Sequence, residues 1–181
     1  MEKVKEVPYG VADFVTVMEQ NLYYVDKTMF IPELEKQPRN LFFIRPRRFG
    51  KSTFLSMLHS YYDCNQSAKF QSLFGNLWIG QHPTELQGKY QVLFLDFSQV
   101  SGNIDSLERN FDFYCSVKLD GFMRRYGEAY SEETREKVRK AEYAMDKLAF
   151  IHDEAAQKGF DAIRKILFDS DGNRRTYELV G

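Results

Sequence analysis

The stretch NLFFIRPRRFGKSTFLSML, from Asn40 to Leu58, constrains the fold of this chain more than any other. Its first part is a continuous apolar run bounded by Asn40 and Pro46, which predicts a strand buried on both faces. Beyond Gly50, apolar and aromatic residues recur at helical spacing, so a helix is expected to begin near Gly50. Strand, loop and helix in this order are what a phosphate-binding loop requires.

The loop ends in four residues whose chemistry suits a nucleoside triphosphate. Gly50 lets the backbone approach phosphate oxygens without a side chain in the way. Lys51 is placed to reach the outer phosphates, and the Ser52 hydroxyl to complete the ligand shell of a Mg²⁺ ion. Thr53, in the first helical turn, adds a donor for an inner phosphate. These residues predict a site for the phosphates of a nucleoside triphosphate, with Mg²⁺ as its metal.

The start of the loop departs from the phosphate-loop pattern G-x-x-x-x-G-K-[ST]. Arg45 stands where the pattern has its first glycine, and a side chain there narrows the choice of backbone angles. Pro46 fixes one backbone angle and stiffens the loop. Arg47 and Arg48 add guanidinium groups that suit phosphate oxygens. The alternative is a basic turn whose arginines are solvated or paired with carboxylates, and the residues alone leave both open.

Composition limits the class of protein. The chain has 181 residues, of which 43% are hydrophobic and 15% aromatic, enough for one domain with a full core. A formal net charge of −1 provides no overall attraction to nucleic acid or to a membrane. No apolar stretch reaches the length of a membrane span, and the N-terminus lacks the apolar segment of a signal peptide. Cys64 and Cys115 stand alone without metal-ligand spacing, as ordinary thiols of a reducing compartment do, so a cytoplasmic protein without a cysteine metal site is expected.

Other segments complete the expected secondary structure. The run YQVLFLDFS, residues 90–98, predicts a second buried strand, and LYYVDKT, residues 22–28, a brief one. Thr28 is a candidate cap for a helix over residues 29–36. Helical spacing predicts further helices over the segments 12–21, 106–126, 131–151 and 154–167. The tail, residues 166–181, fits either a hairpin or a loop.

The alternation of strand and helix patterns predicts the fold class α/β. We expect a P-loop NTPase-like layered domain with a mainly parallel sheet, partial or truncated, and a helix-rich C-terminal half. The expected organisation is a single domain over residues 1–181, with a core in residues 8–100 and a helical region in residues 104–168.

Asp96 ends the run VLFLD, which has the form of a Walker B strand: four apolar residues and then a carboxylate. In hydrolytic P-loop enzymes such a carboxylate holds Mg²⁺ through water. Ser52 and Asp96 are therefore the candidate metal residues, and Lys51 and Asp96 the candidate catalytic ones. A P-loop phosphotransferase that uses Asp96 as metal anchor or base is an alternative.

The segments YGVADF, YYVDKT, FIRPRRFGKSTFLSML and VLFLDFS together resemble the predicted AAA-ATPase-like family of bacteria, over residues 8–100. Members of that family carry an N-terminal ATPase-like domain of the P-loop class. Their loop reads like R-P-R-R-F-G-K-[ST], so the resemblance makes Arg45 typical. It implies a nucleotide-phosphate loop made of Arg47, Phe49, Gly50, Lys51, Ser52 and Thr53.

The same resemblance bears on two further elements. Asp26, Lys27 and Thr28 match the family's VDKT element, which either flanks the nucleotide or caps a helix; we favour the cap. In the family, LDFS belongs to an earlier strand, and the Walker B strand comes later in a pattern like L-I-D-E-Y-D. Neither that pattern nor the family's nuclease-like domain is present, as in a truncated or naturally short member.

The predicted function is ATP binding, with ATP hydrolysis left open because no water-activating acid is visible. A homo-oligomer or a protein partner that supplies an arginine finger fits this prediction. The non-enzymatic alternative is a module that binds a protein or a nucleic acid through Arg45, Arg47 and Arg48.

Overall fold

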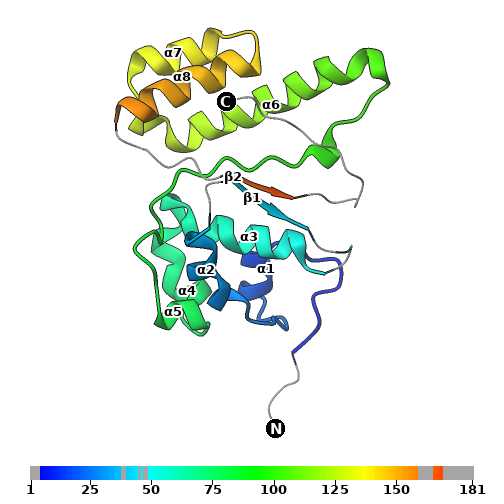
Figure 1. Ribbon diagram of the computed structural model, residues 1–181, viewed down its shortest axis with the longest axis vertical. Coiled ribbons are helices and arrows are strands. Elements are labelled where there is room, and N and C mark those ends of the chain that lie inside the picture. The colour runs from blue at the N-terminus through cyan, green and yellow to red at the C-terminus, as the bar shows by residue number, and fades with distance from the viewer. Residues whose placement is uncertain (1–4, 38–39, 45, 47–48, 159–164, 169–181) are drawn as a thin grey trace. The chain divides into compact units, whose positions relative to one another are not determined.

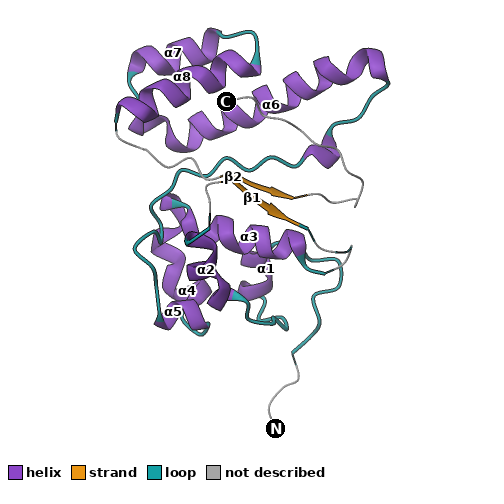
Figure 2. Ribbon diagram, in the orientation of Figure 1, coloured by secondary structure: helices purple, strands orange, loops and turns teal. Residues whose placement is uncertain are grey.

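The computed structural model describes residues 5–37, 40–44, 46, 49–158 and 165–168 (Figure 1). Contacts divide the chain into two compact units. The first comprises residues 1–90 with 164–181, and the second comprises residues 91–163. Helices predominate over strands in the described part of both units (Figure 2). The expectation of a single domain over residues 1–181 stays a prediction.

The first unit contains a small parallel sheet. Strand β1 (Asn40–Phe43) pairs with β2 (Lys165–Phe168), and the register runs from Asn40 opposite Lys165 to Phe43 opposite Phe168. Strand β1 lies within the apolar run that predicts a strand. Helix α3 (Lys51–Tyr62) follows it and begins where the helical spacing places it. Strand, loop and helix therefore succeed one another as expected.

The core of the first unit is built by short helices around α3. They are α1 (Phe14–Glu19), the 3₁₀ turn η1 (Thr28–Phe30), α2 (Ile31–Glu35), η2 (Cys64–Lys69), α4 (Phe70–Phe74) and α5 (Trp78–Gln81). The buried cluster consists of Phe14, Ile31, Phe54, Met57, Leu58, Tyr61, Leu73, Phe74 and Ile79. Four of these belong to α3, one face of which is thereby anchored in the core. The N-terminal end of α3, at its N-cap Gly50, is exposed.

The second unit is helical in its described residues. It contains the 3₁₀ turn η3 (Phe97–Gln99), α6 (Ile104–Tyr126), η4 (Gly127–Ala129), α7 (Glu132–Lys140) and α8 (Ala144–Gln157). Helix α6 matches the helix predicted for residues 106–126. The predicted helix over residues 131–151 is wrong, because α7 and α8 divide it. The Asp112 carboxylate on α6 accepts the Ala144 N–H at 2.9 Å and so begins a new helix there.

The predicted fold class is wrong for the described part of the chain. The described residues contain two strands, β1 and β2, and are otherwise mostly helix and loop. A layered α/β domain around a mainly parallel sheet is therefore not present in them. Residues 22–28 and 91–96 form no strand, and Tyr90 makes an isolated bridge to Asp63. The predicted helix over residues 154–167 is wrong as well, since α8 ends at Gln157 and β2 begins at Lys165.

Tyrosine side chains replace a neighbouring strand along residues 91–96. The Tyr126 hydroxyl accepts the Val92 N–H at 3.2 Å, and the Tyr114 hydroxyl accepts the Asp96 N–H at 2.6 Å. A third bond joins the Tyr130 hydroxyl to the Gln91 side chain at 2.6 Å. Since a backbone N–H in a half-buried segment must find an acceptor, the Tyr126 and Tyr114 hydroxyls allow this apolar run to lie against helix α6 without pairing in a sheet.

Candidate functional site

Gly50 makes the turn between the loop and α3. Its backbone is left-handed, with φ 72° and ψ 24°, and it is the N-cap residue of the helix. A glycine adopts this conformation at no steric cost, whereas a side chain would strain it. The Gly50 carbonyl accepts the Phe54 N–H at 2.9 Å, which closes the first helical turn. The glycine thus allows the chain to turn directly into α3.

The first turn of α3 brings three predicted site residues together. Lys51 and Thr53 are half-buried, and Ser52 is exposed. The first N–H groups of any helix have no carbonyl of their own helix to bond to, and the helix dipole makes this end positive. A helix end of this kind attracts phosphate and other anions. Phe49, just before the glycine, is 59% exposed. Arg45, Arg47 and Arg48 lie outside the described residues.

A pocket of about 190 Å³ opens beside Gly50. It is bounded by the η1–α2 segment on one side and by the loop and α3 on the other, and its lining residues are Lys27, Phe30, Glu33, Leu34, Gln37, Phe49, Gly50 and Phe54. The Lys27 ammonium nitrogen lies 3.8 Å from the position that a Cβ on Gly50 would occupy. The fold therefore adds Lys27 to the cationic surroundings of the loop. The carboxylate that lines the pocket, Glu33, forms an ion pair with Lys36 at 2.7 Å.

The VDKT element caps a helix, but a distant one. Asp26 Oδ1 accepts the Thr28 N–H at 2.8 Å and the Thr28 hydroxyl at 2.7 Å. Asp26 Oδ2 accepts the Trp78 N–H at 2.7 Å, and the Thr28 hydroxyl oxygen accepts the Ile79 N–H at 3.1 Å. Both acceptors thus serve the N-terminus of α5. The predicted cap of residues 29–36 is wrong, because the Thr28 hydroxyl bonds to α5 instead.

The element also serves the pocket, because Lys27 stands between the two capping residues. Tyr24, three residues before Lys27, packs edge-on against Phe14, with ring centroids 5.3 Å apart. Burial, assisted by the nearby Asp26 carboxylate, raises the pKa of Tyr24 well above its usual range, so this tyrosine stays neutral. The segment that carries Lys27 is therefore held on both sides by buried contacts.

The family model described as "Predicted AAA-ATPase" matches residues 8–166. The chain belongs to this AAA-ATPase-like family. The match includes the Gly50 loop, the VDKT element and Asp96, and it extends well beyond the segments that carry the resemblance in the sequence.

One relative of this AAA-ATPase-like chain comes from Azotobacter chroococcum mcd 1 and bears the name "Uncharacterized protein in vnfD 5'region". It is 43% identical over 63 residues, which are 34% of this chain and 12% of the relative. The matched segment is therefore a small part of that relative's length. No solved structure matches the chain.

Asp96 of this AAA-ATPase-like chain belongs to the second unit, where its side chain caps a short turn. Its Oδ1 accepts the Ser98 N–H at 3.0 Å and the Ser98 hydroxyl at 2.6 Å, which holds the start of η3. The metal and catalytic roles of Asp96 stay predictions. Among the residues that the structure describes, no three His, Cys, Asp or Glu side chains gather as a metal site would need.

The described helices include none that is both long and apolar enough to cross a membrane.

Sequence reasoning did not find the pocket, although one signal was present. Phe30 and Leu34 are four residues apart and so share one face of the α2 region. Helical spacing shows that such a face will be covered, but it does not show that the loop at Phe49 and Gly50 will meet it.

Proposed function

We propose that the first unit binds ATP, together with Mg²⁺, at the Gly50 loop and the first turn of α3. The observation that carries the proposal is the left-handed Gly50 at the N-cap of α3, in the segment that follows a strand of a parallel pair, β1. This geometry offers backbone N–H groups and a positive helix end to an anion. Membership in the AAA-ATPase-like family supports a nucleotide as that anion.

The residues of the first turn of α3 have separate roles in this proposal. Lys51 contacts the outer phosphates, and Thr53 donates to an inner one. The exposed Ser52 hydroxyl fits Mg²⁺, a hard cation that prefers oxygen ligands and takes most of them from phosphates and water. The resemblance adds Arg47 and Phe49 to the phosphate loop.

The proposal is one of binding and not of turnover. Hydrolysis would also need a carboxylate that positions the attacking water. Asp96 is the candidate that the sequence offers, and its carboxylate already accepts two hydrogen bonds from Ser98. No contact among the described residues favours the phosphotransferase or the nucleic-acid module, so neither is proposed.

The test is calorimetric titration of ATP and of the slowly hydrolysed ATPγS, with and without Mg²⁺, into the wild type and Lys51→Ala. We expect Lys51→Ala to weaken binding about 10- to 100-fold, because a hydrogen bond to a charged phosphate is lost. The same variant should lose the increase in melting temperature that ATP causes in the wild type.

The matched control is Lys89→Ala, which removes an exposed lysine of the same unit that does not line the pocket. It should bind ATP as the wild type does. Tight binding that survives Lys51→Ala would refute the assignment of the phosphate loop.

A further inference from the structure

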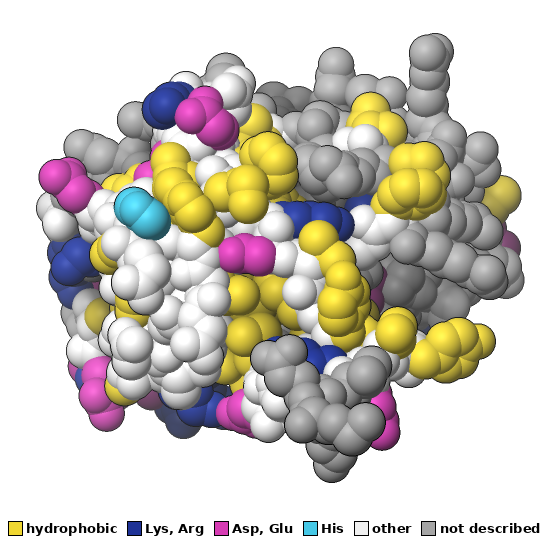
Figure 3. All heavy atoms as spheres, turned by 90° about the horizontal axis from the view of Figure 1, so that it is seen from below, with side chains coloured by type: hydrophobic (Ala, Val, Ile, Leu, Met, Phe, Trp, Pro, Cys, Tyr) yellow, Lys and Arg dark blue, Asp and Glu magenta, His cyan; other side chains and the backbone are white. Residues whose placement is uncertain are grey.

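Exposed aromatic side chains gather at the pocket beside Gly50. Phe30 is 52% exposed and Phe49 is 59% exposed, and both line the pocket together with Leu34 and Phe54. Hydrophobic side chains are prominent on the face of the molecule that Figure 3 shows. Removing apolar surface from water is favourable. A ligand that covers these rings therefore gains binding energy from them.

The size of the pocket indicates which part of a ligand it holds. Its volume is about 190 Å³. Pockets that enclose a whole small molecule measure roughly 300–1,000 Å³. A complete nucleotide does not fit, but one flat ring system does. Because the lining is mostly apolar, a ring fits its chemistry better than a charged phosphate chain does.

The pocket and the loop share an edge. Gly50 lines the pocket and is also the N-cap of α3, so a ligand with its phosphates on the first turn has its other end beside the pocket. The Lys27 ammonium marks this edge, 3.8 Å from the Cβ position of Gly50. A cation at the junction compensates a phosphate that passes from the loop toward the pocket.

We propose that this pocket takes the purine ring of the nucleotide whose phosphates lie on the Gly50 loop, with the Phe30 ring as a stacking face. The inference rests on the proposed function and adds the base subsite to it. A purine offers two flat faces for contact with aromatic side chains. The oxygens of Glu33 and Gln37, which also line the pocket, are acceptors for N–H groups at the edge of the ring.

The test compares ligands that share the phosphates and differ in the base. MgATP, MgGTP, MgCTP and Mg-tripolyphosphate, which has no base, are titrated into the wild type. Both purine nucleotides should bind more tightly than CTP, and CTP more tightly than tripolyphosphate. In Phe30→Ala, affinity for ATP should fall about 5- to 100-fold, whereas affinity for tripolyphosphate should stay unchanged.

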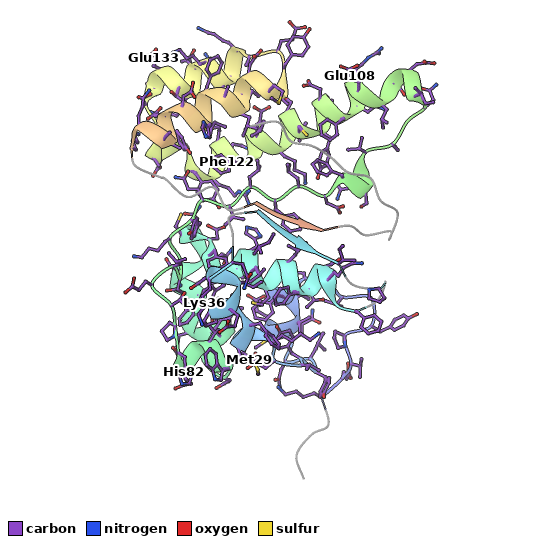
Figure 4. All side chains as sticks on the ribbon, in the orientation of Figure 1. Met29, Lys36, His82, Glu108, Phe122 and Glu133 are labelled. Atoms are coloured by element: carbon purple, nitrogen blue, oxygen red, sulfur yellow. The ribbon has the colours of Figure 1, made fainter. Side chains whose placement is uncertain are left out.

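Two further variants control for the fold. Met29→Ala truncates a neighbouring side chain that is 44% exposed but does not line the pocket, and it should bind ATP like the wild type (Figure 4). Phe30→Tyr keeps the ring and should keep the affinity. Because Phe30 is half-exposed, its truncation is expected to leave the unit folded.

The outcomes separate the base pocket from the phosphate loop. Equal affinities for ATP and tripolyphosphate, both abolished by Lys51→Ala, would overturn the base pocket and leave the loop standing. Equal affinities for ATP and CTP, or a Phe30→Ala variant with normal ATP affinity, would also overturn the purine assignment. If neither ATP nor tripolyphosphate binds the wild type, both proposals fall.

Discussion

Thr28 shows how one residue links segments that are far apart in the chain. Its side chain is fully buried, donates to Asp26 at 2.7 Å and accepts the Ile79 N–H at 3.1 Å. A buried hydroxyl is tolerated only when its hydrogen bonds are made. Thr28 makes both of these hydrogen bonds, so its hydroxyl stabilises the attachment of α5 to the VDKT element. The adjacent Lys27 lines the pocket.

We predict that Thr28→Val lowers the free energy of unfolding of the first unit by about 1–3 kcal/mol. Valine has nearly the shape of threonine, but it leaves the Ile79 N–H without its acceptor in a buried place. Urea denaturation followed by the fluorescence of Trp78 measures this, because that residue is the sole tryptophan and belongs to the first unit.

The matched control is Thr16→Val, which removes a hydroxyl that bonds to Asp13 at an exposed site. It should change the unfolding free energy by about 0.5 kcal/mol or less. An unchanged urea midpoint for Thr28→Val would show that the bond to Ile79 contributes nothing.

At the scale of elements, Glu154 on α8 holds the beginning of α7. Its carboxylate accepts the Ser131 N–H and the Ser131 hydroxyl, both at 2.8 Å, and pairs with Lys158. The hydrogen bond from Lys158, followed by those from Thr134 and Ser131, lowers the pKa of Glu154 to about 2. A second link between elements is the ion pair of the buried Lys147 with Asp120, at 2.7 Å, which joins α8 to α6.

We predict that the second unit loses stability as the pH falls from about 4.5 to about 2 because Glu154 becomes protonated. The pKa of Glu154 is about 2 in the folded protein, lowered from its ordinary value of 4.5. In this range the unfolded chain binds the proton and the folded one does not, so acid favours unfolding. Above about 4.5 the contribution is fully present.

The measurement compares Glu154→Gln with the wild type by urea denaturation at several pH values, followed by far-UV circular dichroism. The difference in unfolding free energy should be largest above about pH 4.5 and should shrink toward pH 2. Glu142→Gln, at an exposed position, should follow the wild type throughout. A difference that does not vary with pH would mean that the Glu154 charge is not what stabilises the contact.

At the scale of the whole molecule, the candidate residues divide between the two units. Gly50, Lys51 and the pocket belong to the first, and Asp96 belongs to the second. The family match covers both units, from residue 8 to residue 166.

We predict that MgATP slows amide hydrogen exchange at residues 49–54 and over the pocket segment 27–37, because ligand binding stabilises the segments that contact it. Hydrogen-exchange mass spectrometry measures this with ATP alone, with Mg²⁺ alone and with both. Additional slowing at residues 96–99 that needs both ATP and Mg²⁺ is the signature of Asp96 as a metal anchor. Its absence would leave Asp96 as the cap of η3, and unchanged exchange at residues 49–54 would contradict ATP binding at the loop.

Sequence reasoning succeeded where the signal is local. The apolar run after Asn40 and the helical spacing beyond Gly50 predict β1 and α3, both of which the structure contains. It failed where an apolar run had to be assigned a partner. Residues 90–98 have the composition of a buried strand. Such a composition indicates that the side chains are buried, but it does not indicate that the backbone pairs with a neighbouring strand.

Residue patterns were enough to predict strand β1, the helix that follows the loop and the family, because each depends on residues that are neighbours in the chain. The meeting of Lys27 and Phe30 with the loop at one pocket depends on the path of the chain in three dimensions. So does the pairing of the Asp96 and Val92 N–H groups with tyrosines 18 and 34 residues away. The physical reason is that a buried N–H or an apolar face needs some partner, while the chain's path through space selects which one.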